Sequence, residues 1–371
     1  METQGVYVGL DVHKDSISVA IAEGERNGEV RSQGSIPNTR EAVSRLVKRV
    51  IDRHGSAEFV QEAGPCGYGL HRLLEDLGQT SRVVAPSRTP KRPGERVKND
   101  TRDAFKLARL LRAGELEFIW VPDSIHEAVR DLVRARQAAS FDVRKARQRI
   151  QSFLLKHNRR YSKKKSWGGQ HRVWLANQSF GHVAQQIAFQ NYLGTEAQAV
   201  SRRTKLDEQI REILPSWSLC PLVEALQALR GVALTIAVCI VAEIGDLSRF
   251  QTARQLMAFI GLVPGEHSSG ASVRPRGITK TGNKIVRSHL LEAAWCYRVR
   301  AKVGERLARR DGSLPEVAKE IAWKAQVRLC GRYRRMVGRG KKSQVVTTAI
   351  ARELVGFIWA IGREFSPPRA S

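Results

Sequence analysis

Cysteine is scarce in this chain, and its placement excludes two classes of small-domain architecture. The five cysteines are Cys66, Cys220, Cys239, Cys296 and Cys330, and no two form a CxxC pair. A zinc ribbon or a disulfide framework is therefore not expected. We interpret the cysteines as reduced, mostly packing residues.

Long apolar runs are also missing. The sequence has no stretch of about 18 apolar residues, so no membrane span is expected. The first residues, METQGVYVGLDVHK, have neither a basic region nor a small-residue cleavage site, so they do not resemble a secretory signal. A bacterial cytoplasmic protein associated with the nucleoid is the interpretation that fits best.

Acidic residues are few relative to basic ones. The 371 residues include 63 Lys and Arg against 36 Asp and Glu, which gives a net charge of +27. Basic residues gather at 91–102, 144–165 and 328–342. Each stretch alone could be a solvated face, but together they favour binding to a nucleic-acid backbone.

Alternating apolar residues and turn signals predict an α/β domain in residues 1–120. The order of elements is predicted to be β-β-β-α-β-α-β, which indicates a mixed sheet with helices on its faces. The expected elements are strands at 6–12, 16–22 and 28–36, a helix at 40–53, a strand at 58–64, a helix at 69–78, a strand at 81–86 and a helix at 103–113.

The rest of the chain is predicted to be mainly helical. A basic, coiled-coil-like arm is expected over 121–220, built from helices at 125–156 and 184–214 with the linker SKKKSWGGQ between them. Residues 221–371 are expected to form a mainly α C-terminal domain. It would contain a stretch rich in Gly, Ser and Arg before a helix that starts near residue 285.

Four acidic residues in the first domain are unexpected for so basic a protein. Asp11 and Glu62 end predicted strands, and Asp100 and Asp103 lie three residues apart at a helix start. Carboxylates repel a polyanion unless a cation offsets them, so the set predicts phosphodiester chemistry with Mg²⁺ as cofactor. Asp100 and Asp103 could instead be favourable charges at a helix N-terminus.

Longer motifs carry a family resemblance. GLDVHKD, EAGPCGYG and KNDTRDAFKLARLL resemble the N-terminal domain of the DEDD transposases of the insertion-sequence one-ten family. The segment from RGVALTIAVC to HLLEAAW resembles the C-terminal transposase domain of the same family. These transposases are serine-using, bridge-RNA-guided recombinases of bacterial mobile elements.

The resemblance implies an RNase H/RuvC-like fold for the first domain, with Asp11, Glu62, Asp100 and Asp103 as its metal-binding tetrad. It also implies a nucleophilic serine in HSSGAS, at Ser269, with the neighbouring Ser268 as the alternative. Its further implications are donor and target DNA as substrates, a guide RNA, and a dimer or tetramer.

The residues around Ser269 fit this role. A serine hydroxyl needs activation to attack, and a glycine after it allows close approach to a phosphate. Basic side chains that could hold nucleic acid follow in the same domain and occur in the arm: Arg274, Arg276, Lys280 and Lys284, and Lys163, Lys164 and Lys165. Without the resemblance, a flexible Ser/Gly loop is the simpler interpretation.

A DNA transposase or recombinase that forms a phosphoserine intermediate is thus the function that the resemblance implies. Two alternatives stay open at this point. One is a Mg²⁺-dependent RuvC-like nuclease or resolvase that uses water. The other is a nucleic-acid-binding protein without catalytic activity.

Overall fold

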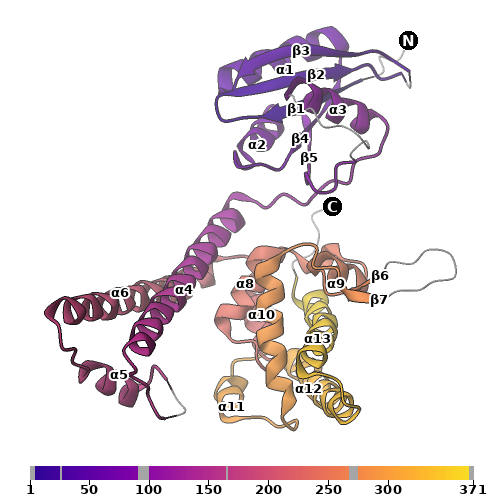
Figure 1. Ribbon diagram of the computed structural model, residues 1–371. Helices are drawn as coiled ribbons and strands as arrows, with labels where there is room; N and C mark the ends of the chain where they lie inside the picture. Colours follow the sequence, from indigo (N-terminus) through magenta and orange to yellow (C-terminus); the bar gives the residue numbers. More distant parts are fainter. Residues whose placement is uncertain (1–4, 26, 91–99, 164–165, 267–274, 367–371) are drawn as a thin grey trace. The chain divides into compact units, whose positions relative to one another are not determined.

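The computed structural model describes residues 5–25, 27–90, 100–163, 166–266 and 275–366 (Figure 1). At Asp100 and Arg276 it describes the backbone alone. The chain forms two compact units, Met1–Val121 and Pro122–Ser371. The first is built on a mixed sheet and the second is mostly helical.

The first unit contains a five-stranded sheet in the order β3-β2-β1-β4-β5. β1 is antiparallel to β2 and parallel to β4, and β5 continues the sheet parallel to β4. The predicted order of elements is confirmed. The elements are β1 (Val6–Val12), β2 (Ser16–Ala22), β3 (Val30–Pro37), α1 (Arg40–His54), β4 (Ala57–Glu62), α2 (Gly69–Asp76), β5 (Thr80–Val84) and α3 (Asp100–Arg112).

Helices cover both faces of this sheet. Alternate residues of β1 and β2, such as Val8 and Val19, pack with apolar residues of α1 and α2 on one face. On the other face, α3 packs Leu107 and Ala108 against residues such as Val60 and Ala20. This is the pattern expected of a sheet buried on both sides.

In the second unit, two long helices form the arm, α4 (Ser124–Lys156) and α6 (Val183–Ile213), close to the predicted bounds. They pack along each other, and a small core at their far end holds Ile150, Leu154 and Phe189. The linker prediction is wrong at its C-terminal end. There α5 (Gly169–Ala176) forms because Leu175 is buried in this small core, against residues of the two long helices.

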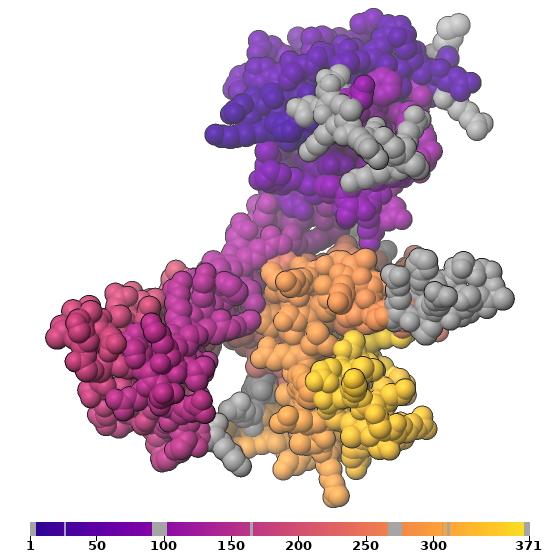
Figure 2. Space-filling view, in the orientation of Figure 1, coloured from indigo at the N-terminus to yellow at the C-terminus, as the bar shows by residue number. Residues whose placement is uncertain are grey.

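The remaining helices pack around one large core. Val129 and Val133 at the base of α4 belong to that core, so the arm is continuous with the helical body (Figures 1 and 2). The elements are η1 (Leu214–Ser216), α7 (Cys220–Leu226), α8 (Leu234–Ile244), η2 (Leu247–Arg249), α9 (Ala253–Ile260), β6 (Pro264–Glu266), β7 (Pro275–Ile278), α10 (Lys284–Ala294), η3 (Trp295–Arg298), α11 (Glu305–Asp311), α12 (Glu316–Gly338) and α13 (Ser343–Phe365).

The cysteines and the most apolar helix of the chain both bear on expectations drawn from composition. Cys220, Cys239 and Cys330 are buried and unbonded, whereas Cys66 and Cys296 are exposed. Within the described ranges, α13 is the one helix long and apolar enough to cross a membrane by length and composition. Half of its most apolar stretch is buried in the unit, and a core helix passes the same test.

Candidate active site

Strands β1 and β4 place Asp11 and Glu62 side by side. The strands are parallel, with Leu10 opposite Gln61, so the next residue of each strand is again a neighbour. Both acidic residues lie at the same edge of the sheet, and both are half-buried. The expectation that they end neighbouring strands is met by this register.

Both residues lie on the sheet face that α3 covers. Residues two apart along a strand share a face, and Gly9 lies two residues before Asp11. A Cβ on Gly9 would lie 2.1 Å from the carbonyl oxygen of Ala104 and 2.5 Å from the amide nitrogen of Ala108. Val60, two residues before Glu62, packs with residues of α3. Glycine at position 9 is therefore what lets α3 lie so close to β1.

The direction of α3 brings its first turn toward the same edge. At its other end, Nη1 of Arg112 donates to the carbonyl oxygens of Gly28 at 2.6 Å and Glu23 at 3.2 Å. These carbonyls follow β2, which is antiparallel to β1, and so lie near the amino end of β1. The helix therefore begins, with Asp100 and Asp103, toward the carboxyl end of β1.

Two neighbouring side chains hold the strand-end carboxylates. Nε2 of His13 lies 3.1 Å from Oδ2 of Asp11. Oγ1 of Thr89, which is buried, donates to Oε1 of Glu62 at 2.8 Å. His13 is thus a hydrogen-bonding neighbour of Asp11. Thr89 was not predicted, because no local pattern marks a threonine 27 residues away as a partner.

Carboxylate oxygens are the ligand type that Mg²⁺ takes in proteins, so the donor chemistry of this edge suits a hard divalent cation. Among the side chains that the structure describes, no group of three His, Cys, Asp or Glu residues could hold a metal ion. The side chain of Asp100 is not among them. Of the four predicted metal ligands, the structure therefore describes the side chains of Asp11, Glu62 and Asp103.

The second predicted part of the site lies between β6 and β7 in the sequence, within β7, and just after it. Ser268, Ser269 and Arg274 lie outside the described residues, between the two strands. Arg276 lies in β7, where only its backbone is described. Lys280 and Lys284 follow the hairpin, and both are exposed.

Lys280 lies in a tightly packed turn, TKTGN (Thr279–Asn283). A Cβ on Gly282 would lie 1.9 Å from the carbonyl oxygen of Phe259, so this turn is pressed against the end of α9. Nη1 of Arg287 donates to the carbonyl oxygens of Thr281 and Ile260, each at 2.8 Å. Lys280 itself has φ 58°, a left-handed conformation that is uncommon for a residue with a side chain.

A buried carboxylate links this turn to the arm. Glu243 of α8 accepts from Nε and Nη2 of Arg134 on α4, at 2.8 and 3.0 Å. It also accepts from Nδ2 of Asn283 at 2.6 Å. Burial by itself would raise the pKa of Glu243, but hydrogen bonds and positive charge from Arg134 outweigh burial, and the pKa lies below its usual value. The carboxylate is therefore held ionised.

The predicted lysines of the arm lie apart from this network. Lys163 is exposed, and its Nζ donates to Oε1 of Gln170 at 3.1 Å near the start of α5. Lys164 and Lys165 lie outside the described residues. Trp167, which follows these lysines, has the guanidinium of Arg147 over its ring at 4.6 Å.

Comparison with known protein families gives two matches, in chain order. The transposase domain of the DEDD type from the IS110 family matches residues 8–158. A domain described as "Transposase IS116/IS110/IS902 family" matches residues 223–309. The DEDD domain implies an RNase H-like fold, with which the mixed sheet of the first unit agrees.

Individual relatives agree with these matches. The y4qE protein of Sinorhizobium fredii, named as a transposase, is 49% identical over 358 residues, which cover 96% of this chain and 88% of that protein. The transposase for insertion sequence element IS1533 of Leptospira borgpetersenii is 29% identical over 91% of this chain and 98% of its own length. The chain therefore belongs to the IS110 family of insertion-sequence transposases, which are enzymes that act on DNA.

Proposed function

We propose that this transposase cuts and rejoins DNA through a phosphoserine intermediate, with Ser269 as the nucleophile and Mg²⁺ held by Asp11, Glu62, Asp100 and Asp103. The observation that carries the proposal is the convergence at the sheet edge. Asp11 and Glu62 end adjacent parallel strands, and both lie on the face of the sheet that α3 covers. The first turn of α3 lies toward the same ends of these strands.

The covalent step balances as a transesterification. The hydroxyl of Ser269 loses its proton as its Oγ bonds to the phosphorus of a DNA phosphodiester. The bond from phosphorus to one sugar oxygen breaks, and that oxygen takes up a proton. Attack by a sugar hydroxyl of another strand then reverses the step, releases the serine and joins the two strands. One phosphoester bond replaces another, so no external energy source is needed.

The chain's own residues would position the reactants. Mg²⁺, when bound, supplies positive charge at the reacting phosphate. His13 and Thr89 fix the orientation of the Asp11 and Glu62 carboxylates. Lys280 in the TKTGN turn and Lys284 at the start of α10 are exposed cations that follow the serine segment, where they could hold the phosphate backbone.

The non-catalytic alternative is set aside, because family membership makes the chain an enzyme acting on DNA. Hydrolysis by water remains the competing mechanism. The deciding experiment is trapping of a covalent protein–DNA adduct with the full chain, Mg²⁺ and a suicide substrate that bears an element end. Wild type and Ser268→Ala should form the adduct, and Ser269→Ala should not. Cleavage by Ser269→Ala without any adduct would favour the water mechanism.

The proposal includes partners. The net charge of +27 and the basic arm support binding of donor DNA, target DNA and a guide RNA. Joining two duplexes requires two reacting strands at once, which favours a dimer or tetramer. Sequencing of RNA that co-purifies from the native host tests the guide. We expect one defined RNA encoded beside the gene, whereas random cellular RNA would contradict a guide.

A further inference from the structure

A large open cleft lies at the arm in the second unit, and none of the catalytic or nucleic-acid-binding residues assigned above lines it. Its volume is about 490 Å³, within the usual range for ligand sites. Helices α4, α6 and α10 and the segment before α5 all contribute to its lining. We call it the arm cleft, and the lining residues on which the argument depends are Gln137, Ser140, Arg144, Arg203, His289 and Glu292.

Two residues that line the arm cleft each have a buried polar atom without a hydrogen-bond partner. They are Ser140 of α4, through its Oγ, and Arg203 of α6, through its Nε. A buried polar atom without a partner costs free energy, and such groups usually signal a missing ligand or a functional constraint. Two of them beside one cleft indicate that something polar binds there.

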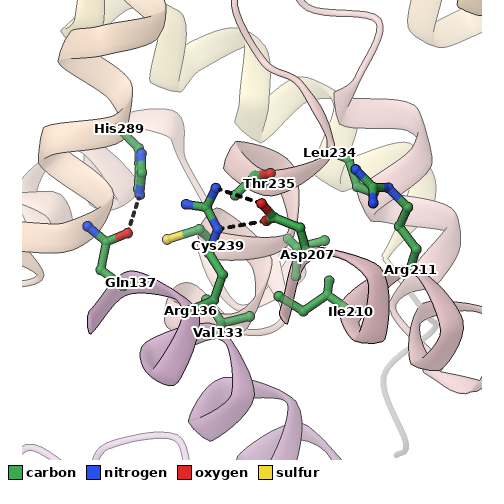
Figure 3. A pocket seen from close by; sticks show the side chains of 11 residues that line it. Val133, Arg136, Gln137, Asp207, Ile210, Arg211, Leu234, Thr235, Cys239 and His289 are labelled. Atoms are coloured by element: carbon green, nitrogen blue, oxygen red, sulfur yellow. Dashed lines mark hydrogen bonds and ion pairs between the residues drawn. The ribbon is translucent and has the colours of Figure 1, made fainter. Parts of the chain in front are cut away.

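The orientation of His289 is set by a neighbour. Its Nε2 lies 3.1 Å from Oε1 of Gln137. Figure 3 shows this contact in a smaller neighbouring pocket of about 10 Å³, which both residues also line. With the amide oxygen of Gln137 as acceptor, Nε2 is the donor of this contact. The other ring nitrogen, Nδ1, lies 3.6 Å from Oε2 of Glu292.

The charge of the cleft is positive. Arg136 is paired with Asp207, as Figure 3 also shows, and Arg147 is paired with Glu196. Arg144 and Arg203 have no carboxylate partner within the described part of the chain. The one carboxylate in the lining is Glu292, whose side chain is 72% exposed.

The chemistry of the ligand follows from these donors. Two arginines without carboxylate partners favour an anion, and Arg is well suited to phosphate. A lone phosphate would leave most of the cleft and its glutamine amides unused. A nucleotide within a strand offers a phosphate for the arginines, and a sugar or base edge for the glutamines.

We infer that the arm cleft binds one phosphodiester-linked nucleotide of a nucleic-acid strand, with its phosphate on Arg144 and Arg203. The site binds the strand at the arm and takes no part in DNA cleavage or joining. The inference rests on the established action of this family on DNA, and it is independent of Ser269 as nucleophile and of the acidic set.

The test uses the full chain and compares Arg203→Met with Lys205→Gln. Lys205 is an exposed cation on the same helix and does not line the cleft. Binding of labelled single-stranded DNA, duplex DNA and single-stranded RNA would be measured by fluorescence anisotropy over a range of salt concentrations. Thermal unfolding of each variant would be measured in parallel.

We expect Arg203→Met to weaken binding of at least one of the three probes by on the order of tenfold, and to reduce its salt slope by about 1. The probe affected identifies the type of strand. The melting temperature should be unchanged or higher, because methionine removes a buried N–H that lacks a partner. The inference would be overturned if Arg203→Met bound all three probes with the same affinity as Lys205→Gln. It would also be overturned if the loss of affinity in Arg203→Met were matched by a loss of stability.

Discussion

Asn283 donates from Nδ2 to Oε2 of Glu243 over 2.6 Å, while Oδ1 of the same amide accepts from the backbone amides of Ile285 and Val286. One side chain therefore caps α10 and binds the buried carboxylate of α8. Arg134 of α4 holds that carboxylate from the other side. The arm is thus connected through Glu243 to the TKTGN turn.

Glu243→Gln should destabilise the second unit by about 2 kcal/mol. Removing one partner of a buried ion pair costs about 3–5 kcal/mol, and half-exposure of Arg134 reduces that figure. Urea denaturation would measure the change, with Glu208→Gln as the exposed control. Equal unfolding free energies for wild type and Glu243→Gln would contradict the proposed connection.

The contribution of Glu243 should also depend on pH. Its pKa is lowered in the folded protein, so the stability it supplies is present above the unfolded pKa of about 4.5 and is lost as the pH falls through the folded pKa. The difference in unfolding free energy between wild type and Glu243→Gln should therefore shrink below about pH 4.5. A difference that stays constant from neutral to acidic pH would count against an ionised Glu243.

Gly9→Ala should damage the first unit. The new methyl group would overlap the backbone of α3 at Ala104 and Ala108, where neither atom can move without the helix. We expect a loss of about 1–3 kcal/mol in unfolding free energy and a loss of DNA cleavage. Gly69→Ala is the matched control, because a Cβ there meets nothing within 4 Å, and it should be neutral.

Asp11→Asn should abolish cleavage without unfolding the protein. The amide keeps the size of the side chain but removes the charge that would hold a divalent cation, so the cleavage rate should fall on the order of 100-fold or more. Asp15→Asn, an exposed aspartate four residues along, should cleave as wild type does. Retained cleavage by Asp11→Asn in Mg²⁺ would remove this carboxylate from the reaction.

Lys280→Gly should separate binding from stability. Glycine accepts the left-handed conformation of Lys280, so the unfolding free energy should change by less than about 1 kcal/mol. Loss of one phosphate contact should lower DNA affinity and reduce the salt slope by about 1. Lys302→Ala, at an exposed lysine outside the turn, should leave the slope unchanged.

Local sequence was enough to predict most helices and strands. Alternating apolar residues marked β1, β2 and β4. In the structure α1 has Thr39 as its N-cap and Gly55 as its C-cap, and both residue types are common at these positions. The short helix α5 was missed because its sequence has little amphipathic pattern of its own. It is held by burial of Leu175 in a core formed by the arm.

Sequence alone also determined the family, the charge and the identity of the acidic residues, because motifs and composition are local properties. Only the tertiary structure decided which side chains meet. Thr89 reaches Glu62 through the pairing of β4 with β5, and Arg134 reaches Glu243 across 109 residues. The arm cleft likewise exists only where three helices pack. No local pattern encodes such contacts, because they form when burial of the core brings distant segments together.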